Sequence, residues 1–158
     1  MKKYKLLITD LDGTLIETVS GNTFPKGIWD MKIKLDVFEA IKNYAPDDIL
    51  IISNQGGIEK GFVDKEMFEY KFDYISSALE KDNINRKPNT GMIDQYMDYI
   101  KFINDNVDEE NKIIYDTIMM IGDASGKEGQ FSDSDKKTAE NFGCEYMDVD
   151  DFVDKYKG

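Results

Sequence analysis

Histidine is absent from this 158-residue sequence, and cysteine occurs once, as Cys144. Without histidine, Ser-His-Asp hydrolysis, phosphohistidine chemistry and the common zinc sites are excluded. A single cysteine cannot form an internal disulfide, which fits a reducing compartment. Carboxylates, lysines and hydroxyls must therefore carry any catalysis.

Positive charge and long apolar runs are also scarce. The 20 Lys and Arg residues against 32 Asp and Glu give a net charge of −12. This charge argues against broad attraction to nucleic acid or anionic membranes, so a nucleic-acid substrate would have to be held locally. The apolar run before Asp10 is too short for a signal peptide or a membrane span. We therefore expect a soluble, cytoplasmic protein with no membrane partner.

Short apolar runs alternate with helical patterns along the chain. Runs at residues 4–9, 49–52 and 117–121 each end in a polar or glycine-rich segment, as buried strands do. Between them, apolar residues recur at helical spacing in three groups: Leu35, Phe38, Ile41 and Tyr44; Phe68, Phe72, Ile75 and Leu79; and Met92, Tyr96, Tyr99 and Ile103. The alternation predicts one α/β domain over residues 1–158, with a Rossmann-like, mostly parallel sheet and helices on both faces. Its site should lie beyond the carboxyl ends of the strands.

The strongest local signal follows the first apolar run, in Asp10-Leu-Asp-Gly-Thr-Leu15. Two carboxylates one residue apart can face one pocket, where Asp10 attacks phosphorus and Asp12 exchanges protons with the leaving oxygen and water. Gly13 would permit a tight turn beside the phosphate, and Thr14 could donate a hydrogen bond. A lone motif of this kind is more often a turn or a calcium loop. The further ligands of an EF-hand are not all present, however.

The complete string resembles the D-x-D-G-T motif of the haloacid dehalogenase (HAD) superfamily, and three later positions extend the resemblance. Ser53 stands where the family has a Ser or Thr that binds the transferring phosphoryl group. Lys87 stands where a lysine neutralises charge on the phosphate and the nucleophile. Asp123, after Gly122, stands where an aspartate completes a Mg²⁺ site with a carboxylate oxygen of Asp10 and the backbone carbonyl of Asp12. The resemblance thus implies a magnesium-dependent phosphatase that forms an aspartyl-phosphate on Asp10.

Longer strings indicate which branch of the family the sequence resembles. The string Ile52-Ser-Asn-Gln-Gly-Gly-Ile58 resembles one shared by polynucleotide kinase 3′-phosphatases and by histidinol and heptose bisphosphate phosphatases. Two other strings are closer to the DNA 3′-phosphatases: Arg86-Lys-Pro-Asn-Thr-Gly-Met92, and Gly122-Asp-Ala-Ser-Gly-Lys127 with the segment 131–143. These strings imply that Asn54, Gln55 and Arg86 join Gly13 and Thr14 in binding the substrate. No Walker motif for a kinase half is present, and neither is the zinc loop of the metabolite branch.

The sequence departs from this pattern in several places. Gln130 replaces an acidic residue, and Lys136 replaces an arginine. Asp135 could orient Lys87 or a metal-bound water, or it could serve in the N-cap of the next helix. Few residues separate the first motif from the first helix, so we expect no large cap domain. The stretch before Arg86 is also short, so the middle strand of the relatives should be reduced or missing.

Three functions remain open from the sequence. The first is removal of a 3′-phosphate from a DNA end, which an uncapped site would suit. A DNA end could be bound by lysines around the opening of the site, although such lysines are more often solvated surface residues. The candidates are Lys26, Lys32, Lys34, Lys60, Lys127, Lys136 and Lys137. The second is hydrolysis of a small phosphorylated metabolite, favoured by the negative charge. The third is a non-catalytic interaction module, suggested by the substitutions around Gln130. We expect a monomer in each case.

Overall fold

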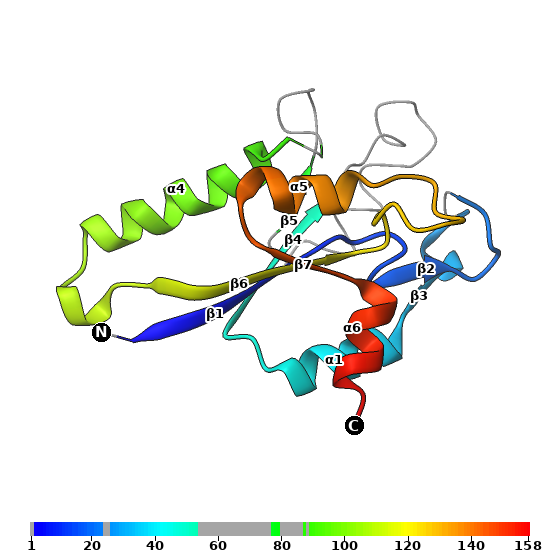
Figure 1. The fold of residues 1–158 in the computed structure, drawn as a ribbon, viewed down its shortest axis with the longest axis horizontal. Helices are drawn as coiled ribbons and strands as arrows, with labels where there is room; N and C mark the ends of the chain where they lie inside the picture. The colour runs from blue at the N-terminus through cyan, green and yellow to red at the C-terminus, as the bar shows by residue number, and fades with distance from the viewer. Residues whose placement is uncertain (1, 24–25, 54–76, 80–86, 88) are drawn as a thin grey trace.

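The computed structural model describes residues 2–23, 26–53, 77–79, 87 and 89–158. At its centre lies a five-stranded sheet in the order β5-β4-β1-β6-β7, in which every neighbouring pair is parallel (Figure 1). The strands are β1 (Lys3–Thr9), β4 (Asp48–Ser53), β5 (Ser77–Leu79), β6 (Ile114–Gly122) and β7 (Glu145–Asp148). The predicted parallel sheet is confirmed. Because β1 lies in the middle, its carboxyl end adjoins those of β4 and β6.

Helices cover both faces of the sheet (Figure 1). Helices α1 (Leu35–Tyr44) and α6 (Val149–Tyr156) pack on one face, and α4 (Gly91–Asp105) and α5 (Ser134–Phe142) pack on the other. Successive strand residues point to opposite faces. Leu7 of β1 accordingly packs with α1 and α6, whereas Leu6 and Ile8 pack with α4 and α5. The sheet is thus buried on both sides, as its nearly continuous apolar strands require.

Two of the predicted helices lie where the apolar spacing placed them, but the spacing predicted their buried faces only in part, with Ile41, Tyr44 and Met92 buried as expected. In α1 the buried residues include Val37 and Ala40, whereas Leu35 is 77% exposed and Phe38 is 42% exposed. In α4, Tyr99 is exposed. The third pattern lies mostly outside the described residues, and its last member was assigned wrongly, because Leu79 belongs to β5. The residues on both sides of β5 lie outside the described part of the chain, so the expected reduction of the relatives' middle strand stays a prediction.

A small antiparallel hairpin follows the first acidic motif and was not predicted. It joins β2 (Ile16–Thr18) to β3 (Met31–Ile33) through a loop that ends in a 3-10 turn, Ile28–Asp30. The fully buried carboxylate of Asp30 accepts hydrogen bonds from the backbone and hydroxyl of Ser20 and from the backbone N–H of Lys26. These bonds tie Ser20 and Lys26 to the 3-10 turn at the end of the loop. No large cap domain occurs among the described residues, as expected.

The carboxyl-terminal part also contains elements that the apolar pattern did not reveal. Strand β7 is four residues long, and α6 follows it directly with Asp148 as its N-cap. A second 3-10 turn, Glu109–Asn111, precedes β6. No helix in the described part of the chain is long and apolar enough to cross a bilayer.

Candidate active site

Three predicted site residues meet at the carboxyl edge of the sheet. Asp10 follows β1, Ser53 ends β4 and Asp123 follows β6. The backbone N–H of Asp10 donates to the carbonyl of Ile121 at 3.1 Å, which continues the β1–β6 ladder to the start of the acidic loop. Asp10 and Ser53 are 6% and 1% exposed, and Asp123 is partly exposed. Parallel pairing therefore brings residues more than 40 positions apart to one edge, as the sequence predicted.

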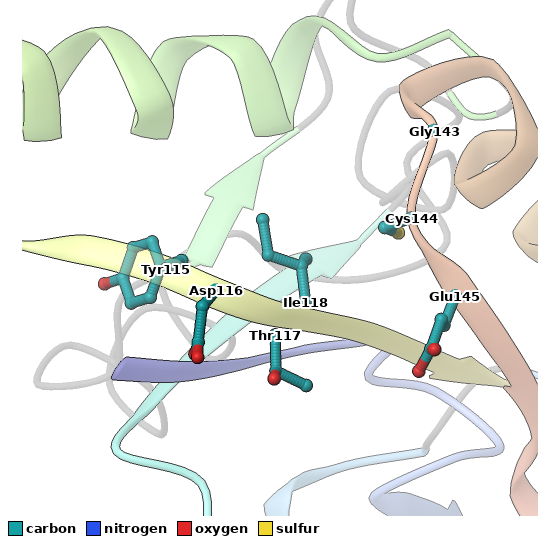
Figure 2. Close-up of a pocket in the computed structure, with 7 residues that line it drawn as sticks. All are labelled: Tyr115, Asp116, Thr117, Ile118, Gly143, Cys144 and Glu145. Carbon is teal, nitrogen blue, oxygen red and sulfur yellow. The ribbon is translucent and has the colours of Figure 1, made fainter. Parts of the chain in front are cut away.

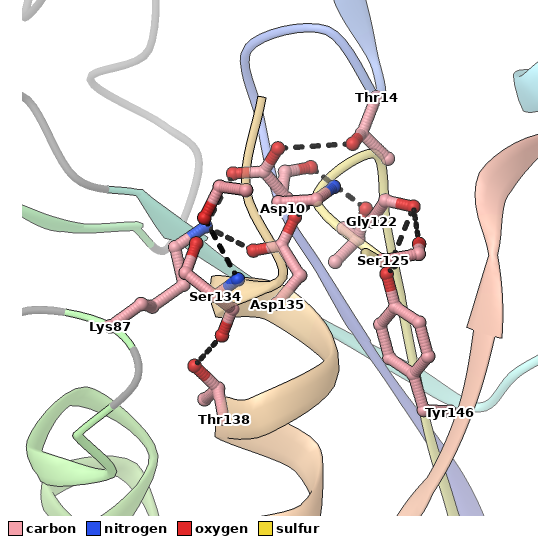
Figure 3. A network of polar contacts seen from close by, with 12 residues as sticks. Asp10, Thr14, Lys87, Gly122, Ser125, Ser134, Asp135, Thr138 and Tyr146 are labelled. Carbon is pink, nitrogen blue, oxygen red and sulfur yellow. Dashed lines mark hydrogen bonds and ion pairs between the residues drawn. The ribbon is translucent and has the colours of Figure 1, made fainter. Parts of the chain in front are cut away.

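Lys87 enters this edge from the segment before α4. Its Nζ lies 2.7 Å from Oδ1 of Asp10 and 2.5 Å from Oδ1 of Asp135 (Figure 3). All three side chains are almost completely buried. Burial by itself would lower the pKa of the Lys87 ammonium, but the carboxylates of Asp10 and Asp135 outweigh it and raise that pKa above its ordinary value. Lys87 is therefore a permanent positive charge against Asp10.

Asp135 belongs to this centre and does not act as a helix cap. It lies in the first turn of α5, whose N-cap is Asp133, and its side chain is 1% exposed. Besides Lys87, it accepts a hydrogen bond from the backbone N–H of Ala124 at 3.0 Å. Gly122 leaves room for it, because a Cβ at that position would overlap the Asp135 carboxylate. The segment 132–135 thus provides the helix cap, as one alternative expected, but through Asp133, while Asp135 contacts Lys87.

Three carboxylates cluster around the single ammonium. Asp10, Asp123 and Asp135 each offer an oxygen, and these oxygens all lie within 4.8 Å of one another. Burial and the neighbouring Asp10 carboxylate raise the pKa of Asp123 to about 8, and the same two causes raise the pKa of Asp135 against the opposing charge of Lys87. Full ionisation of the three carboxylates would thus place more negative charge in the cluster than Lys87 can neutralise. Oxygen-only ligands of this kind fit Mg²⁺.

The acidic loop is shaped by Gly13 and Thr14. Gly13 has a φ of +81°, and a Cβ there would overlap the Asp123 carboxylate. The Thr14 hydroxyl donates to Oδ2 of Asp10 at 3.0 Å, and the Lys34 ammonium donates to the Gly13 carbonyl at 3.1 Å. Asp12, by contrast, is exposed to solvent. Asp10 is thus fixed in place, while Asp12 can reach water.

A second polar network holds the loop that carries Asp123. The Asp148 carboxylate is 4% exposed and accepts hydrogen bonds from the Ser125 hydroxyl at 2.6 Å and from Nε2 of Gln130 at 2.8 Å. Oε1 of Gln130 accepts from the backbone N–H of Ser125 at 2.8 Å. Tyr146 donates to the Gly122 carbonyl at 3.1 Å and contacts the Ser125 hydroxyl (Figure 3). In the sequence, Gln130 stands out only as a departure from the family pattern. In the structure, its amide links the loop to Asp148, the N-cap residue of α6.

Several lysines expected at the opening already have acidic partners. Ion pairs join Lys32 to Glu17, Lys127 to Asp148 and Asp151, and Lys137 to Asp133. Their charges are partly neutralised, which limits their attraction for a phosphate backbone. Asn54, Gln55, Lys60 and Arg86 lie outside the described residues.

One cavity among the described residues lies away from this edge. It has a volume of about 290 Å³ and is lined by residues at the start of β6 and around the start of β7, including Thr117, Cys144 and Glu145 (Figure 2). At about 3.3 Å per strand residue, it lies on the order of 20 Å along the strand from Asp123. Burial raises the pKa of Cys144 to about 11, so its thiol is a poor nucleophile at neutral pH.

Comparison with known proteins identifies the family. The family model described as "Polynucleotide kinase 3 phosphatase" matches residues 5–153, which is nearly the whole chain. The chain belongs to this family. The polynucleotide kinase 3 phosphatases are phosphatases of the HAD type, so the resemblance inferred from the motifs is confirmed.

The chain is also similar to two relatives in sequence and to one solved structure in fold. The chain is 32% identical over 164 residues to the bifunctional polynucleotide phosphatase/kinase of Schizosaccharomyces pombe, but spans only 38% of that protein's length. It is 27% identical over 169 residues to a 20.8 kDa protein of Autographa californica nuclear polyhedrosis virus, covering 96% of this chain and 87% of that one. The fold is similar to that of D,D-heptose 1,7-bisphosphate phosphatase from B. bronchiseptica, solved with magnesium and phosphate. Its TM-score is 0.57 at 20% identity, over 90% of this chain and 78% of that one.

Proposed function

We propose that this protein is a Mg²⁺-dependent phosphomonoesterase that forms an aspartyl-phosphate on Asp10. The observation that carries the proposal is the buried contact of Asp10 with Lys87 at 2.7 Å, beside the carboxylates of Asp123 and Asp135. A fixed cation against a buried carboxylate suits a nucleophile that receives a negatively charged phosphoryl group. Thr14 holds the other carboxylate oxygen of Asp10, so its orientation is set from both sides.

The reaction has two steps that reuse the same residues. In the first, a carboxylate oxygen of Asp10 bonds to phosphorus as the ester P–O bond breaks, and Asp12 gives its proton to the departing oxygen. In the second, Asp12 removes a proton from a water whose oxygen attacks phosphorus, which releases phosphate and restores the Asp10 carboxylate. Lys87 and Ser53 bind the phosphoryl oxygens in both steps. The exposure of Asp12 suits its exchange of protons with water.

Mg²⁺ would be held by the carboxylates of Asp10 and Asp123 and by the backbone carbonyl of Asp12, with Asp135 beside them. When bound, it would neutralise charge on the phosphoryl group and on the cluster. The raised pKa of Asp123 supports this assignment, since a divalent cation would replace the proton that the metal-free cluster favours.

We further propose that the substrate is a 3′-phosphate at a DNA end. Membership of the polynucleotide kinase 3 phosphatase family and the relative named polynucleotide phosphatase/kinase support this choice. A small phosphorylated metabolite is the second candidate, supported by the net charge of −12 and by the ion pairs that already occupy several lysines. The substitution at Gln130 no longer argues for a non-catalytic module, because Gln130 has a structural role in holding the Asp123 loop.

One set of assays tests these proposals. Purified protein with Mg²⁺ is offered a 3′-phosphorylated oligonucleotide and a panel of sugar and amino-alcohol phosphates. We expect release of phosphate from the oligonucleotide, and Asp10→Asn should abolish it while the circular dichroism spectrum stays unchanged. Turnover of the metabolites alone would reject the DNA substrate. Full activity in Asp10→Asn would reject the aspartyl-phosphate.

A further inference from the structure

A small cavity opens between the acidic loop and the β2–β3 hairpin. Its volume is about 190 Å³, and its lining includes Asp12 and Gly13 on the loop and Ile16, Glu17 and Met31 on the hairpin. Asp12 is the residue that would protonate the departing oxygen, so the group attached to that oxygen must lie against Asp12. We propose that this cavity holds the leaving group of the phosphoester, an inference that rests on the proposed function.

The size and lining of the cavity define the class of leaving group. One water occupies about 30 Å³ of liquid, so the space fits roughly one small ring and falls below the ~300 Å³ at which drug-sized pockets begin. Ile16 is 4% exposed and Met31 packs against the core, and together they give the cavity an apolar wall. Thr18 and Asn22 supply polar groups, and the Thr18 hydroxyl donates to the Asn22 carbonyl at 2.7 Å, which fixes the rim. A ring that carries hydroxyl groups matches this combination.

The charge of the residues that line the cavity further limits which leaving groups it can hold. Asp12 and Glu17 are both carboxylates, and the described residues that line the cavity include no lysine or arginine. Glu17 pairs with Lys32 at 3.3 Å, but both side chains are about half exposed, so solvent screens the pair. A negatively charged group on the leaving ring would lie beside Glu17 and be repelled. The cavity therefore selects an uncharged sugar, either that of a terminal nucleoside or that of a small sugar monophosphate.

Two residues of the β2–β3 hairpin can exchange their charges without loss of the ion pair between them. Glu17 and Lys32 face each other across β2 and β3, so the double variant Glu17→Lys/Lys32→Glu keeps an ion pair while placing a cation on the cavity. The matched control is Glu109→Lys/Lys112→Glu, which reverses the 2.8 Å pair before β6, at the opposite end of the sheet. Both variants leave the net charge of the protein unchanged.

The experiment compares two substrates that differ in the charge of the leaving group: glycerol 3-phosphate, and 3-phosphoglycerate, which carries a carboxylate. The kcat/KM for 3-phosphoglycerate divided by that for glycerol 3-phosphate should rise about tenfold in the cavity variant and stay within about twofold of wild type in the control. Thymidine 3′-monophosphate and glucose 6-phosphate distinguish the two sources of the sugar, because the better substrate identifies which ring the cavity fits.

Acetyl phosphate separates the two possible failures, because its leaving group is too small to need the cavity. If wild-type protein hydrolyses acetyl phosphate and the substrate ratio does not change in the cavity variant, the leaving-group site is overturned and the phosphatase proposal stands. If wild-type protein hydrolyses none of these phosphates, both proposals fall.

Discussion

Asp135 Oδ1 lies 2.5 Å from the Nζ of Lys87, and the same ammonium lies 2.7 Å from Asp10. Lys87 is thus held between two carboxylates that come from opposite ends of the chain. The backbone N–H of Ala124 fixes the other oxygen of Asp135 at 3.0 Å, so the carboxylate cannot follow Lys87 if the lysine moves. Asp135 therefore sets where the positive charge stands relative to Asp10.

Asp135→Asn should lower kcat by about 10–100-fold, because Lys87 loses one of the two carboxylates that hold it. Steady-state hydrolysis of a 3′-phosphorylated oligonucleotide measures the loss. Asp133→Asn is the matched control: Asp133 is the N-cap residue of α5 but makes no side-chain capping hydrogen bond, and its carboxylate pairs with the exposed Lys137 at 3.4 Å. Equal losses in both variants would contradict a positioning role for Asp135.

Mg²⁺ affinity should increase with pH, because the cation and the proton compete for Asp123, whose pKa is raised to about 8. The folded-state pKa lies above the unfolded value of 3.8, so the metal-free fold binds the extra proton and loses stability as pH rises through about 8. We expect the apparent Kd for Mg²⁺ from thermal shift to be at least about tenfold weaker at pH 6 than at pH 8. Asp123→Asn should remove most of this difference, and its persistence would assign the titration to another group.

Gly13→Ala should impair both stability and activity, because Gly13 combines a φ of +81° with close approach to the Asp123 carboxylate. Gly129→Ala is the control, since Gly129 has a φ of +84° but nothing within 4 Å of the added Cβ. Both variants carry the conformational cost of about 1 kcal/mol, and only Gly13→Ala must also displace Asp123. Urea unfolding and Mg²⁺ titration should show a weakened metal response in Gly13→Ala alone.

Gln130→Glu should lower the free energy of unfolding by about 1–3 kcal/mol, because it replaces the amide donor facing Asp148 with a second carboxylate. Adding Asp148→Asn should recover at least half of that loss, since an amide then faces the new carboxylate. Denaturation of the single and double variants in EDTA tests the coupling without a contribution from metal. A double variant that is no more stable than Gln130→Glu would show that the pair does not act through this hydrogen bond.

The local pattern predicted the strands well because β1, β4 and β6 are buried on both faces and so read as continuous apolar runs. It also placed Asp10, Ser53 and Asp123 at strand ends. The β2–β3 hairpin escaped prediction because its loop is held by the buried carboxylate of Asp30 and not by an apolar pattern. The spacing predicted only half of the buried face of α1, because Leu35 and Phe38 match the spacing but are exposed.

The sequence by itself determined the chemistry available to this protein: carboxylates and lysines without histidine, an acidic motif after the first strand, and strings that identify its phosphatase family. Only the tertiary structure decided which of these groups meet. From the sequence, Asp135 could equally have been a helix cap, and Gln130 was only a departure from the pattern of the family. Their roles depend on distances to Lys87 and Asp148. Such distances are set when the parallel sheet aligns strand ends and the helices pack against it, which no local spacing records.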